Sequence, residues 1–404
     1  MQRVLSDQLP RYVGETVTVA GWVHRRRVLA NVTFVIIRDR AGLLQVVTTG
    51  QEAPAEEQVV SVTGRVVRHG GVELVEPEFT VLAQAEAPPV ELFRPTVKAS
   101  LPVLLDHAAV TLRHPARRSV FAASAAAVRA FRAALDAQGF TEVFTPKIVG
   151  SATESGADVF ELDYFGEKAY LAQSPQFYKQ TMVGVFERVY EVGPVFRAEP
   201  HDTSRHLATY TSLDAELGFV EDHRDVMAVL TEVIRAMVAA VREHGRPVDL
   251  PGEIPTLHFR DALRMVGAPE DEPDLAPEHE RALGEWAAGT HGSDFVFVEG
   301  YPMRKRPFYT HPQPDDPRWS NSFDLLFRGV ELVTGGQRLH RYADYLAAVP
   351  DPEPLEGYLE AFRHGMPPHG GFAIGLERFM ARVTGAANVR ETVLFPRDLH
   401  RLAP

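Results

Sequence analysis

The sequence predicts an α+β protein with two domains, and three observations lead to this prediction. The first 85 residues contain only short stretches with the alternation typical of β-strands. A Pro-rich segment without periodicity separates them from a long Ala-rich amphipathic helix. Beyond that helix, strands that are adjacent in sequence occur between helices, which favours an antiparallel sheet flanked by helices. We therefore predict a β-domain in residues 1–85, a hinge or linker in residues 86–112 and an α+β domain in residues 113–404.

The N-terminal domain is expected to be a small β-barrel or sandwich. Its predicted strands are Val17–Val23, Val32–Arg38, Leu43–Val47, Val59–Val67, Val72–Val75 and Thr80–Leu82. The oligonucleotide-binding (OB) barrel is one of the few folds with so many strands in so short a stretch. A β-barrel without a ligand fits the strand pattern equally well.

The larger domain is predicted to begin with a helix over Pro115–Gln138, which has Pro near its start and Gly just past its end. Strands are expected at Phe140–Phe144, Val189–Arg197, Thr211–Val220 and Phe323–Thr334. Asp222 is the expected N-cap of a helix that reaches Glu243, and Leu376–Val383 is the last predicted helix. Residues 247–290 are rich in Pro, Glu and Asp with weak periodicity, so they resemble an insertion over the core.

Composition excludes several classes of protein. The chain has no cysteine, which rules out disulfides, thiolate metal sites and thiol catalysis. No apolar run approaches the about 20 residues that span a bilayer, and the N-terminal residues lack a secretory apolar core, so we expect no membrane partner and a cytoplasmic protein. The net charge of −12 taken alone disfavours a nucleic-acid partner.

The distribution of charge changes that interpretation. Residues 1–85 contain nine arginines and nine acidic residues, so the excess of acid lies downstream. The same part contains the run Arg25–Arg27. Three consecutive arginines are commonly a solvated strand end, but they also suit contacts with a nucleic-acid backbone.

Three motifs have residue types that suit phosphate chemistry. Arg197 and Glu199 are expected on one face of a strand, where they would form a salt bridge or bind a phosphate and a purine amine. Asp324 and Glu331 are hard oxygen ligands of the kind that hold Mg²⁺ against phosphates, or two unrelated acids on adjoining strands. In the third motif, glycines from Gly370 to Gly375 precede a helix that begins with Leu376-Glu377-Arg378.

In this order the three motifs resemble the signature motifs of the class II aminoacyl-tRNA synthetases. The Pro115–Gln138 helix and the strand that follows are similar to motif 1, the dimer element of the family. The segment from Arg197 to Glu216 resembles motif 2, and Gly370–Arg390 resembles motif 3. The resemblance covers essentially the whole chain. It implies an OB-fold anticodon-binding domain, a class II catalytic domain and a homodimer.

Local sequence resembles the archaeal-type aspartyl enzymes of the family. The segment Gln173–Gln180 is similar to the aspartyl pattern, in which Lys179 reaches the side-chain carboxylate of the substrate. The resemblance implies that Arg338 supplies a second cation. It assigns Asp214 and Gln176 to the α-amino end of L-aspartate and Glu154 to a mobile loop that closes over it. Two cations aimed at one carboxylate can reject asparagine, which shape alone cannot do.

The resemblance also implies that ATP is the second substrate and that Mg²⁺ is bound by Asp324 and Glu331. Arg197 and Arg378 would act as the catalytic residues by neutralising charge on the phosphates. The residues assigned to ATP are Arg197, Glu199, Arg205, His206, Leu207, Glu331, Gly375 and Arg378. His206 fits a simple loop histidine equally well.

In the barrel, the resemblance implies that an anticodon base stacks on Phe34 and that Gln45 and Glu73 contact its edge. Arg25 and its two neighbours would meet the tRNA backbone. His24 stands where enzymes specific for tRNA-Asp tend to have a bulkier ring, so we expect tRNA-Asp and hypothesise tRNA-Asn as substrates.

Three other functions remain open at this point. An asparaginyl-tRNA synthetase is the nearest, although Lys179 argues against it. A tRNA-independent paralogue that forms a small amide is the second, but such proteins commonly lose the barrel. The third is a nucleic-acid-binding or regulatory protein that keeps the fold without the chemistry.

Overall fold

The structure is a computed structural model, and it describes residues 3–50, 52–150, 158–249 and 252–402. The chain divides into two compact units, Met1–Arg118 and Ser119–Pro404. Among the described residues, the longest helices all lack the apolar stretch needed to cross a membrane. The α+β class predicted from the sequence is confirmed.

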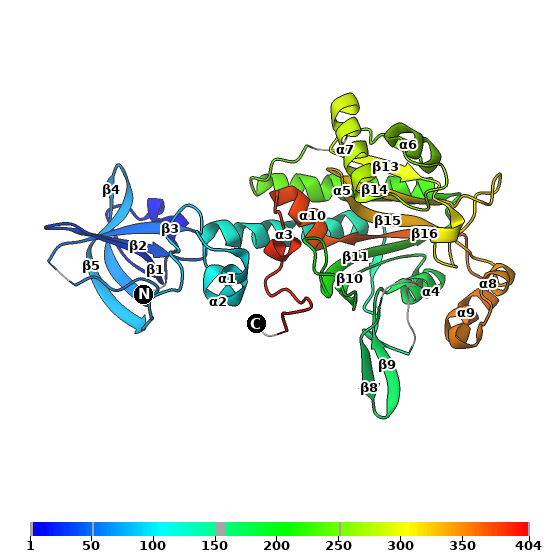
Figure 1. The fold of residues 1–404 in the computed structure, drawn as a ribbon. Helices are drawn as coiled ribbons and strands as arrows, with labels where there is room; N and C mark the ends of the chain where they lie inside the picture. Colours follow the sequence, from blue (N-terminus) through cyan, green and yellow to red (C-terminus); the bar gives the residue numbers. More distant parts are fainter. Residues whose placement is uncertain (1–2, 51, 151–157, 250–251, 403–404) are drawn as a thin grey trace. The chain divides into compact units, whose positions relative to one another are not determined.

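The first unit is a closed five-stranded barrel with the strand order β1-β2-β3-β5-β4 (Figure 1). Its strands are β1 (Thr16–Val28), β2 (Thr33–Arg38), β3 (Leu43–Thr48), β4 (Val59–His69) and β5 (Gly71–Ala83). Alternate side chains such as Val19, Val35, Val46 and Val62 fill the interior because strand side chains alternate between faces. The two short strands predicted at Val72–Val75 and Thr80–Leu82 are parts of the single strand β5.

The segment 86–112, predicted to be a hinge, contains two short helices that group with the barrel. They are α1 (Leu101–Asp106) and α2 (Ala108–Thr111). Polar contacts explain the grouping. Arg113 Nη1 lies 3.0 Å from Glu57 Oε2, and Arg118 donates to the backbone carbonyls of Asp39 and Arg40. The residues that directly follow this segment are therefore anchored to the barrel by an ion pair and hydrogen bonds.

The second unit is built on an eight-stranded sheet with the order β12-β13-β14-β15-β16-β11-β10-β6. Its pairs are antiparallel except β12 with β13 and β10 with β6, which are parallel, so the predicted antiparallel sheet is mixed at its two ends. The strands are β6 (Thr141–Glu142), β10 (Arg188–Phe196), β11 (Thr209–Gly218), β12 (Thr256–His258), β13 (Phe295–Glu299), β14 (Ser322–Phe327), β15 (Glu331–Arg338) and β16 (His369–Gly375).

A smaller sheet and the remaining helices complete this unit. The small sheet has the order β7-β9-β8, with β7 (Ile148–Val149), β8 (Glu161–Tyr164) and β9 (Glu167–Leu171). The helices are α3 (Pro115–Asp136, which starts in the first unit), α4 (Gln176–Phe186), α5 (His223–Glu243), α6 (Phe259–Val266), α7 (Pro277–His291), α8 (Tyr342–Ala348), α9 (Glu356–Arg363) and α10 (Leu376–Thr384).

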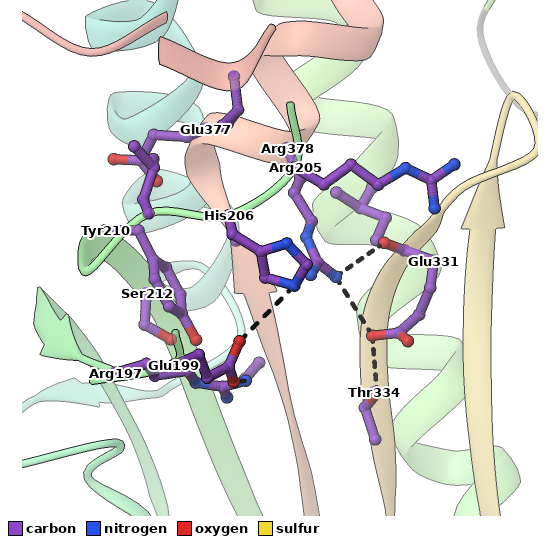
Figure 2. Close-up of a pocket in the computed structure, with 15 residues that line it drawn as sticks. Arg197, Glu199, Arg205, His206, Tyr210, Ser212, Glu331, Thr334, Glu377 and Arg378 are labelled. Carbon is purple, nitrogen blue, oxygen red and sulfur yellow. Dashed lines mark hydrogen bonds and ion pairs between the residues drawn. The ribbon is translucent and has the colours of Figure 1, made fainter. Parts of the chain in front are cut away.

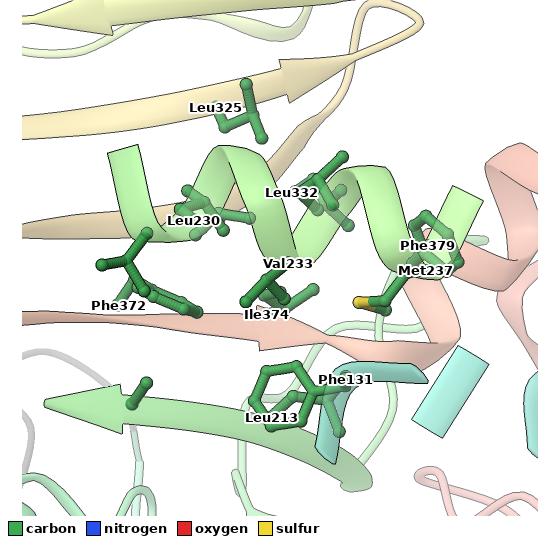
Figure 3. Close-up of a cluster of buried hydrophobic side chains, with 14 of the residues drawn as sticks. Phe131, Leu213, Leu230, Val233, Met237, Leu325, Leu332, Phe372, Ile374 and Phe379 are labelled. Carbon is green, nitrogen blue, oxygen red and sulfur yellow. The ribbon is translucent and has the colours of Figure 1, made fainter. Parts of the chain in front are cut away.

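The main core lies between the large sheet and the helices α3, α5 and α10 (Figure 3). Helix α5 begins as predicted, because the Asp222 side chain accepts a hydrogen bond from the backbone N–H of Arg224. It buries Leu230, Val233 and Met237 against the sheet, as expected from their spacing along one helix face. This packing holds one face of the sheet in place. The polar site lies on the other face of the same strands.

The segment 247–290, expected to resemble an insertion over the core, contains regular structure in its described part: β12, α6 and α7. Strand β12 extends the large sheet beside β13, and helices α6 and α7 bury Phe259, Leu263, Leu283 and Ala287 in a cluster of their own. A three-residue strand is too short to show alternation, and Pro and acidic residues in the connections mask the helical period. The segment is therefore part of the domain.

Candidate active site

A cavity of about 130 Å³ opens on the large sheet where β11, β15 and β16 meet the start of α10 (Figure 2). Its walls contain every residue that the sequence assigned to ATP. The lining residues are Arg197, Glu199, Arg205, His206, Leu207, Tyr210, Ser212, Glu331, Leu332, Thr334, Ala373, Gly375, Glu377, Arg378 and Val389. The structure thus brings together residues that are up to about 190 positions apart in the sequence. They meet because β11 and β16 are neighbouring strands of the sheet.

Arg197 and Glu199 lie just beyond the end of β10 at Phe196, not within a strand as the sequence predicted. Both still line the cavity, with Arg197 Nη1 3.9 Å from Glu199 Oε1. The Arg197 guanidinium lies 5.5 Å from the centre of the Tyr210 ring. A cation, a carboxylate and an aromatic face therefore surround one side of the cavity, which suits a phosphate next to a purine.

The loop between β10 and β11 contributes Arg205 and His206. His206 Nδ1 lies 2.6 Å from Thr203 Oγ1, and Nε2 lies 3.6 Å from Glu199 Oε2. Burial lowers the pKa of His206, which favours the neutral ring despite the nearby Glu199 carboxylate. Arg205 Nη1 lies 3.6 Å from Oε2 of Glu280 on α7, a residue that the sequence did not suggest.

On the opposite side, Arg378 reaches across from α10 to β15. Its Nη1 lies 3.5 Å from Glu331 Oε1 and donates to the backbone oxygen of Glu331 over 3.4 Å (Figure 2). The neighbouring Glu377 accepts the backbone N–H of Thr211 at 3.0 Å and ties α10 to β11. Arg378 is therefore held at the cavity wall with Glu331 as its carboxylate partner.

The predicted magnesium ligands share one face of the β14–β15 hairpin. Asp324 and Thr334 are direct cross-strand partners, and Thr334 Oγ1 donates to Glu331 Oε1 over 3.4 Å. Glu331 and Thr334 line the cavity, whereas Asp324 is buried behind them and lies 3.2 Å from Arg306 Nη2. Burial raises the pKa of Asp324, because Arg306 does not fully offset the loss of solvent.

These oxygens fit a hard cation that is also held by phosphates. Within the described part of the chain, no three His, Asp or Glu side chains gather as a ready metal site. Mg²⁺ commonly uses one or two carboxylates and takes its other ligands from water and substrate phosphates. The carboxylates of Glu331 and Asp324 match that pattern.

A row of polar side chains leads from this cavity to a buried charge cluster. Ser212, Asp214 and Glu216 alternate along β11 and so point to the same face of the sheet. Lys179 Nζ lies 3.1 Å from Asp214 Oδ1 and 3.3 Å from Glu216 Oε2. Arg338 Nε donates to Glu216 Oε1 over 2.9 Å. The two cations predicted to bind the substrate side chain are thus both present, separated by Glu216.

Glu216 is ionised in this cluster. Burial acts to raise the pKa of this carboxyl group, but Arg338 and Lys179 outweigh burial and hold the pKa below its usual range. His369 lies close by, and burial lowers its pKa to about 4. Since the Pro367 carbonyl accepts from its Nδ1, His369 presents Nε2 as an acceptor to Gln180 Nε2 at 3.0 Å.

Gln176 lies on α4, one turn before the buried Gln180. It donates through Nε2 to Gln180 Oε1 over 2.9 Å, and Tyr358 also donates to that oxygen. This buried network orients the helix that presents Lys179. Glu154, the predicted loop residue, lies outside the described residues.

In the barrel, the structure places Phe34, Gln45 and Glu73 on one outer face. Gln45 pairs with Ile36 on β2 and with Glu73 on β5, and its Nε2 donates to Glu73 Oε2 over 2.7 Å. Phe34 is half-buried and pairs with Arg27 across the strands. Arg25 is exposed, with its guanidinium 4.8 Å from the Phe93 ring centre. An aromatic ring, an amide, a carboxylate and arginines thus share one surface.

His24 does not share this surface, so its predicted place among the contact residues is not supported. It lies at a register shift between Val23 and Arg25 and is buried, with 7% of the residue exposed. Its Nδ1 accepts from Arg38 Nη1 at 3.1 Å, and Arg38 pairs with Glu57. Burial, followed by the charge of Arg38, lowers the pKa of His24 to about 4.

Two family models match the chain. The model for class II tRNA synthetases (D, K and N) matches residues 100–399, and the model for OB-fold nucleic acid binding domains matches residues 17–82. This chain belongs to the class II tRNA synthetases of the aspartate, lysine and asparagine branch.

Relatives of this class II synthetase match over their whole length. The aspartate–tRNA(Asp/Asn) ligase of Deinococcus radiodurans is 46% identical, with 100% of this chain and 99% of that protein covered. The ligase of the same name from Thermus thermophilus is also 46% identical, with both chains fully covered. Among solved structures, the asparaginyl-tRNA synthetase of Pyrococcus horikoshii complexed with asparaginyl-adenylate has a TM-score of 0.91 at 30% identity, with full coverage of both chains.

Three residues of this synthetase site were missed from the sequence. Glu216 separates the two cations, Glu280 pairs with Arg205, and Arg306 pairs with Asp324. Glu216 could have been found, because it lies two residues after Asp214 on a predicted strand, so both side chains point to the same face. Glu280 and Arg306 lie on segments in which the sequence shows no motif. Tertiary packing alone brings them to the site.

Proposed function

We propose that this chain activates L-aspartate with ATP and transfers it to tRNA. The observation that carries the proposal is the buried pair Lys179 and Arg338 around Glu216, reached along β11 from the cavity that suits ATP. The relatives named aspartate–tRNA ligases support the same amino acid.

Charge accounting explains why aspartate fits this cluster. Two cations and two carboxylates, Asp214 and Glu216, balance when no substrate is present. If Asp214 takes the α-ammonium group of the substrate, Glu216 cancels one cation and one positive charge remains for the substrate side chain. Aspartate neutralises that charge, whereas asparagine leaves it buried and uncompensated. Sites built on such polar contacts discriminate by roughly 10⁴–10⁵.

The first reaction step is an in-line attack of the substrate α-carboxylate on the α-phosphorus of ATP, with pyrophosphate as the leaving group. The attacking group is already an anion, so this step requires no general base. Arg197 and Arg378 face the cavity from opposite sides and would neutralise charge on the transferred phosphate. Bound Mg²⁺, held by Glu331 and Asp324, would supply further charge neutralisation on the phosphates. A terminal ribose hydroxyl of tRNA then displaces AMP from the adenylate.

For the tRNA, we propose that the barrel stacks an anticodon base on Phe34 and contacts its edge through Gln45 and Glu73. Both tRNA-Asp and tRNA-Asn are proposed substrates, in keeping with the names of the two relatives. Helix α3 and strand β6 are the proposed dimer element. As an enzyme of translation, the protein is proposed to act in the cytoplasm.

The deciding experiment is ATP–pyrophosphate exchange with aspartate or asparagine, followed by aspartylation of tRNA-Asp and tRNA-Asn transcripts. We expect exchange with aspartate only and charging of both transcripts. Exchange with asparagine alone would make the chain an asparaginyl enzyme. Charging of tRNA-Asp with no detectable charging of tRNA-Asn would limit the proposal to one tRNA.

A further inference from the structure

A second, smaller cavity of about 50 Å³ adjoins the site on the side of α10. It shares Arg205, Arg378 and Val389 with the larger cavity. Among the residues that line only the smaller cavity, Arg382 is the one with a charged side chain. Neither the sequence motifs nor the proposed reaction assigned it a role.

Arg382 is one helical turn beyond Arg378, so both side chains lie on the same face of α10. The side chain is half-buried. Among the residues that the structure describes, none makes a hydrogen bond or ion pair to its guanidinium. In contrast, Arg205 has Glu280 and Arg378 has Glu331 as carboxylate partners.

Two other guanidinium groups, those of Arg205 and Arg328, act on Arg382. Burial lowers the pKa of its guanidinium, and Arg205 and Arg328 lower it further. Arg328 is itself paired with Asp294 at 2.8 Å. A half-buried cation among like charges is unfavourable unless an anion joins the group, because an uncompensated charge loses solvation without a partner.

The walls of the smaller cavity are held in place by hydrogen bonds. The backbone N–H of Val389 donates to the Ser204 carbonyl over 2.9 Å, and Arg390 donates to the Thr203 carbonyl over 3.2 Å. These bonds join the loop that presents Arg205 to the segment after α10. Ala381, Ala386 and Ala387 line the cavity beside Arg382 with small side chains.

We infer that Arg382 completes, with Arg205 and Arg378, an anion subsite that holds the terminal phosphate of ATP and then the pyrophosphate leaving group. The inference rests on the proposed function, in which the larger cavity takes ATP. A tRNA backbone phosphate has the same chemistry, but the shared walls with the ATP cavity favour the nucleotide. Guanidinium groups bind phosphate oxygens through paired, charge-assisted hydrogen bonds.

The test compares Arg382→Gln and Arg382→Lys with wild type, using the full chain. Arg260→Gln is the matched control, because Arg260 is an exposed arginine on α6 and the same charge is removed. Calorimetry measures binding of magnesium pyrophosphate directly, and aspartate-dependent exchange gives KM for pyrophosphate, ATP and aspartate. A thermal melt of each variant checks folding.

For Arg382→Gln we expect pyrophosphate affinity to fall about tenfold, as for the loss of one charge-assisted hydrogen bond, with KM for aspartate unchanged. Arg382→Lys should recover part of the loss, and Arg260→Gln should match wild type. Unchanged pyrophosphate affinity in Arg382→Gln would overturn the inference. A rise in KM for tRNA with no change in pyrophosphate affinity would also overturn the inference, because this outcome assigns Arg382 to a tRNA phosphate.

The calorimetric measurement separates this inference from the proposed function. If the wild type binds pyrophosphate but shows no exchange with aspartate, the proposed function fails and the subsite stands. If exchange occurs and Arg382→Gln binds pyrophosphate as tightly as wild type, the subsite fails and the proposed function stands.

Discussion

Lys179 and Arg338 approach the same carboxylate, Glu216, from its two oxygens, at 3.3 Å and 2.9 Å. Neither cation is more than 8% exposed in its side chain. Because both oxygens of Glu216 are engaged, the carboxylate fixes the distance between the cations before any substrate arrives. A substrate carboxylate therefore meets a preorganised pair and does not have to assemble it.

Lys179→Met should abolish most aspartate activation while the chain still folds. Removal of one member of a buried charge group costs about 2–5 kcal/mol, which corresponds to a loss of at least about 30-fold in kcat/KM. Aspartate-dependent exchange measures the loss. Lys168→Met is the control, because Lys168 is an exposed lysine on β9 that pairs with Glu161. Retention of wild-type exchange by Lys179→Met would show that Lys179 has another role.

Phe34→Ala should weaken tRNA recognition without affecting amino-acid activation. Loss of one base-stacking ring costs about 1–3 kcal/mol, so KM for tRNA should rise about 5- to 150-fold. Aminoacylation kinetics measure this rise, and tRNA-free exchange should stay at the wild-type rate. Leu82→Ala removes an exposed apolar side chain from the same barrel and should change neither value. Equal KM values for Phe34→Ala and wild type would remove Phe34 from the anticodon surface.

The sequence predicted many of the residues that meet in the larger cavity and on one outer face of the barrel, through the order of the motifs and the family resemblance. Phe34 and Gln45 could be placed on predicted strands before any coordinates were known. The burial of His24 could not be predicted, since it lies at a register shift and is covered by contacts with Arg38, and no local sequence pattern indicates such a shift. Glu280 was equally hidden, because its helix comes to the cavity through packing with a distant hairpin.

His24 should make the stability of the chain depend on mildly acidic pH. Its pKa is about 4 in the folded state and about 6.5 in the unfolded state. Between these values the unfolded chain binds more protons, so stability falls as the pH drops from about 7 to about 5. His24→Asn keeps an acceptor for Arg38 but does not titrate, so its melting temperature should fall less over that range.

The control for this experiment is His69→Asn, in which an exposed histidine at the end of β4 is replaced. Its melting temperature should follow that of wild type at each pH. If His24→Asn and wild type lose the same number of degrees, His24 does not contribute to the acid sensitivity.

Gly284→Ala should destabilise the packing of α7 against the β14–β15 turn. A Cβ atom at Gly284 would lie 2.5 Å from the backbone nitrogen of Gly329, so the helix or the turn must move. Overpacking of this kind costs about 1–3 kcal/mol. Because α7 also presents Glu280 to Arg205 and to the backbone N–H of Glu331, KM for ATP should rise as well.

Gly289→Ala is the matched control on the same helix. A Cβ at Gly289 meets nothing within 4 Å, so the change should be neutral or stabilise by up to about 1 kcal/mol. Thermal unfolding compares the two variants. A Gly284→Ala variant as stable as Gly289→Ala would contradict the close packing of α7.

The strand β16 behind the charge cluster limits how this enzyme could change its amino acid. A Cβ at Gly371 would clash with Glu216 Oε2, and Arg338 Nη2 donates to the Gly371 carbonyl. Main-chain atoms therefore form the back wall of the amino-acid pocket, and no shorter side chain can be substituted there to enlarge it. During evolution, a charged side chain in this cluster could therefore be exchanged for another much more easily than the pocket could be enlarged for a larger substrate.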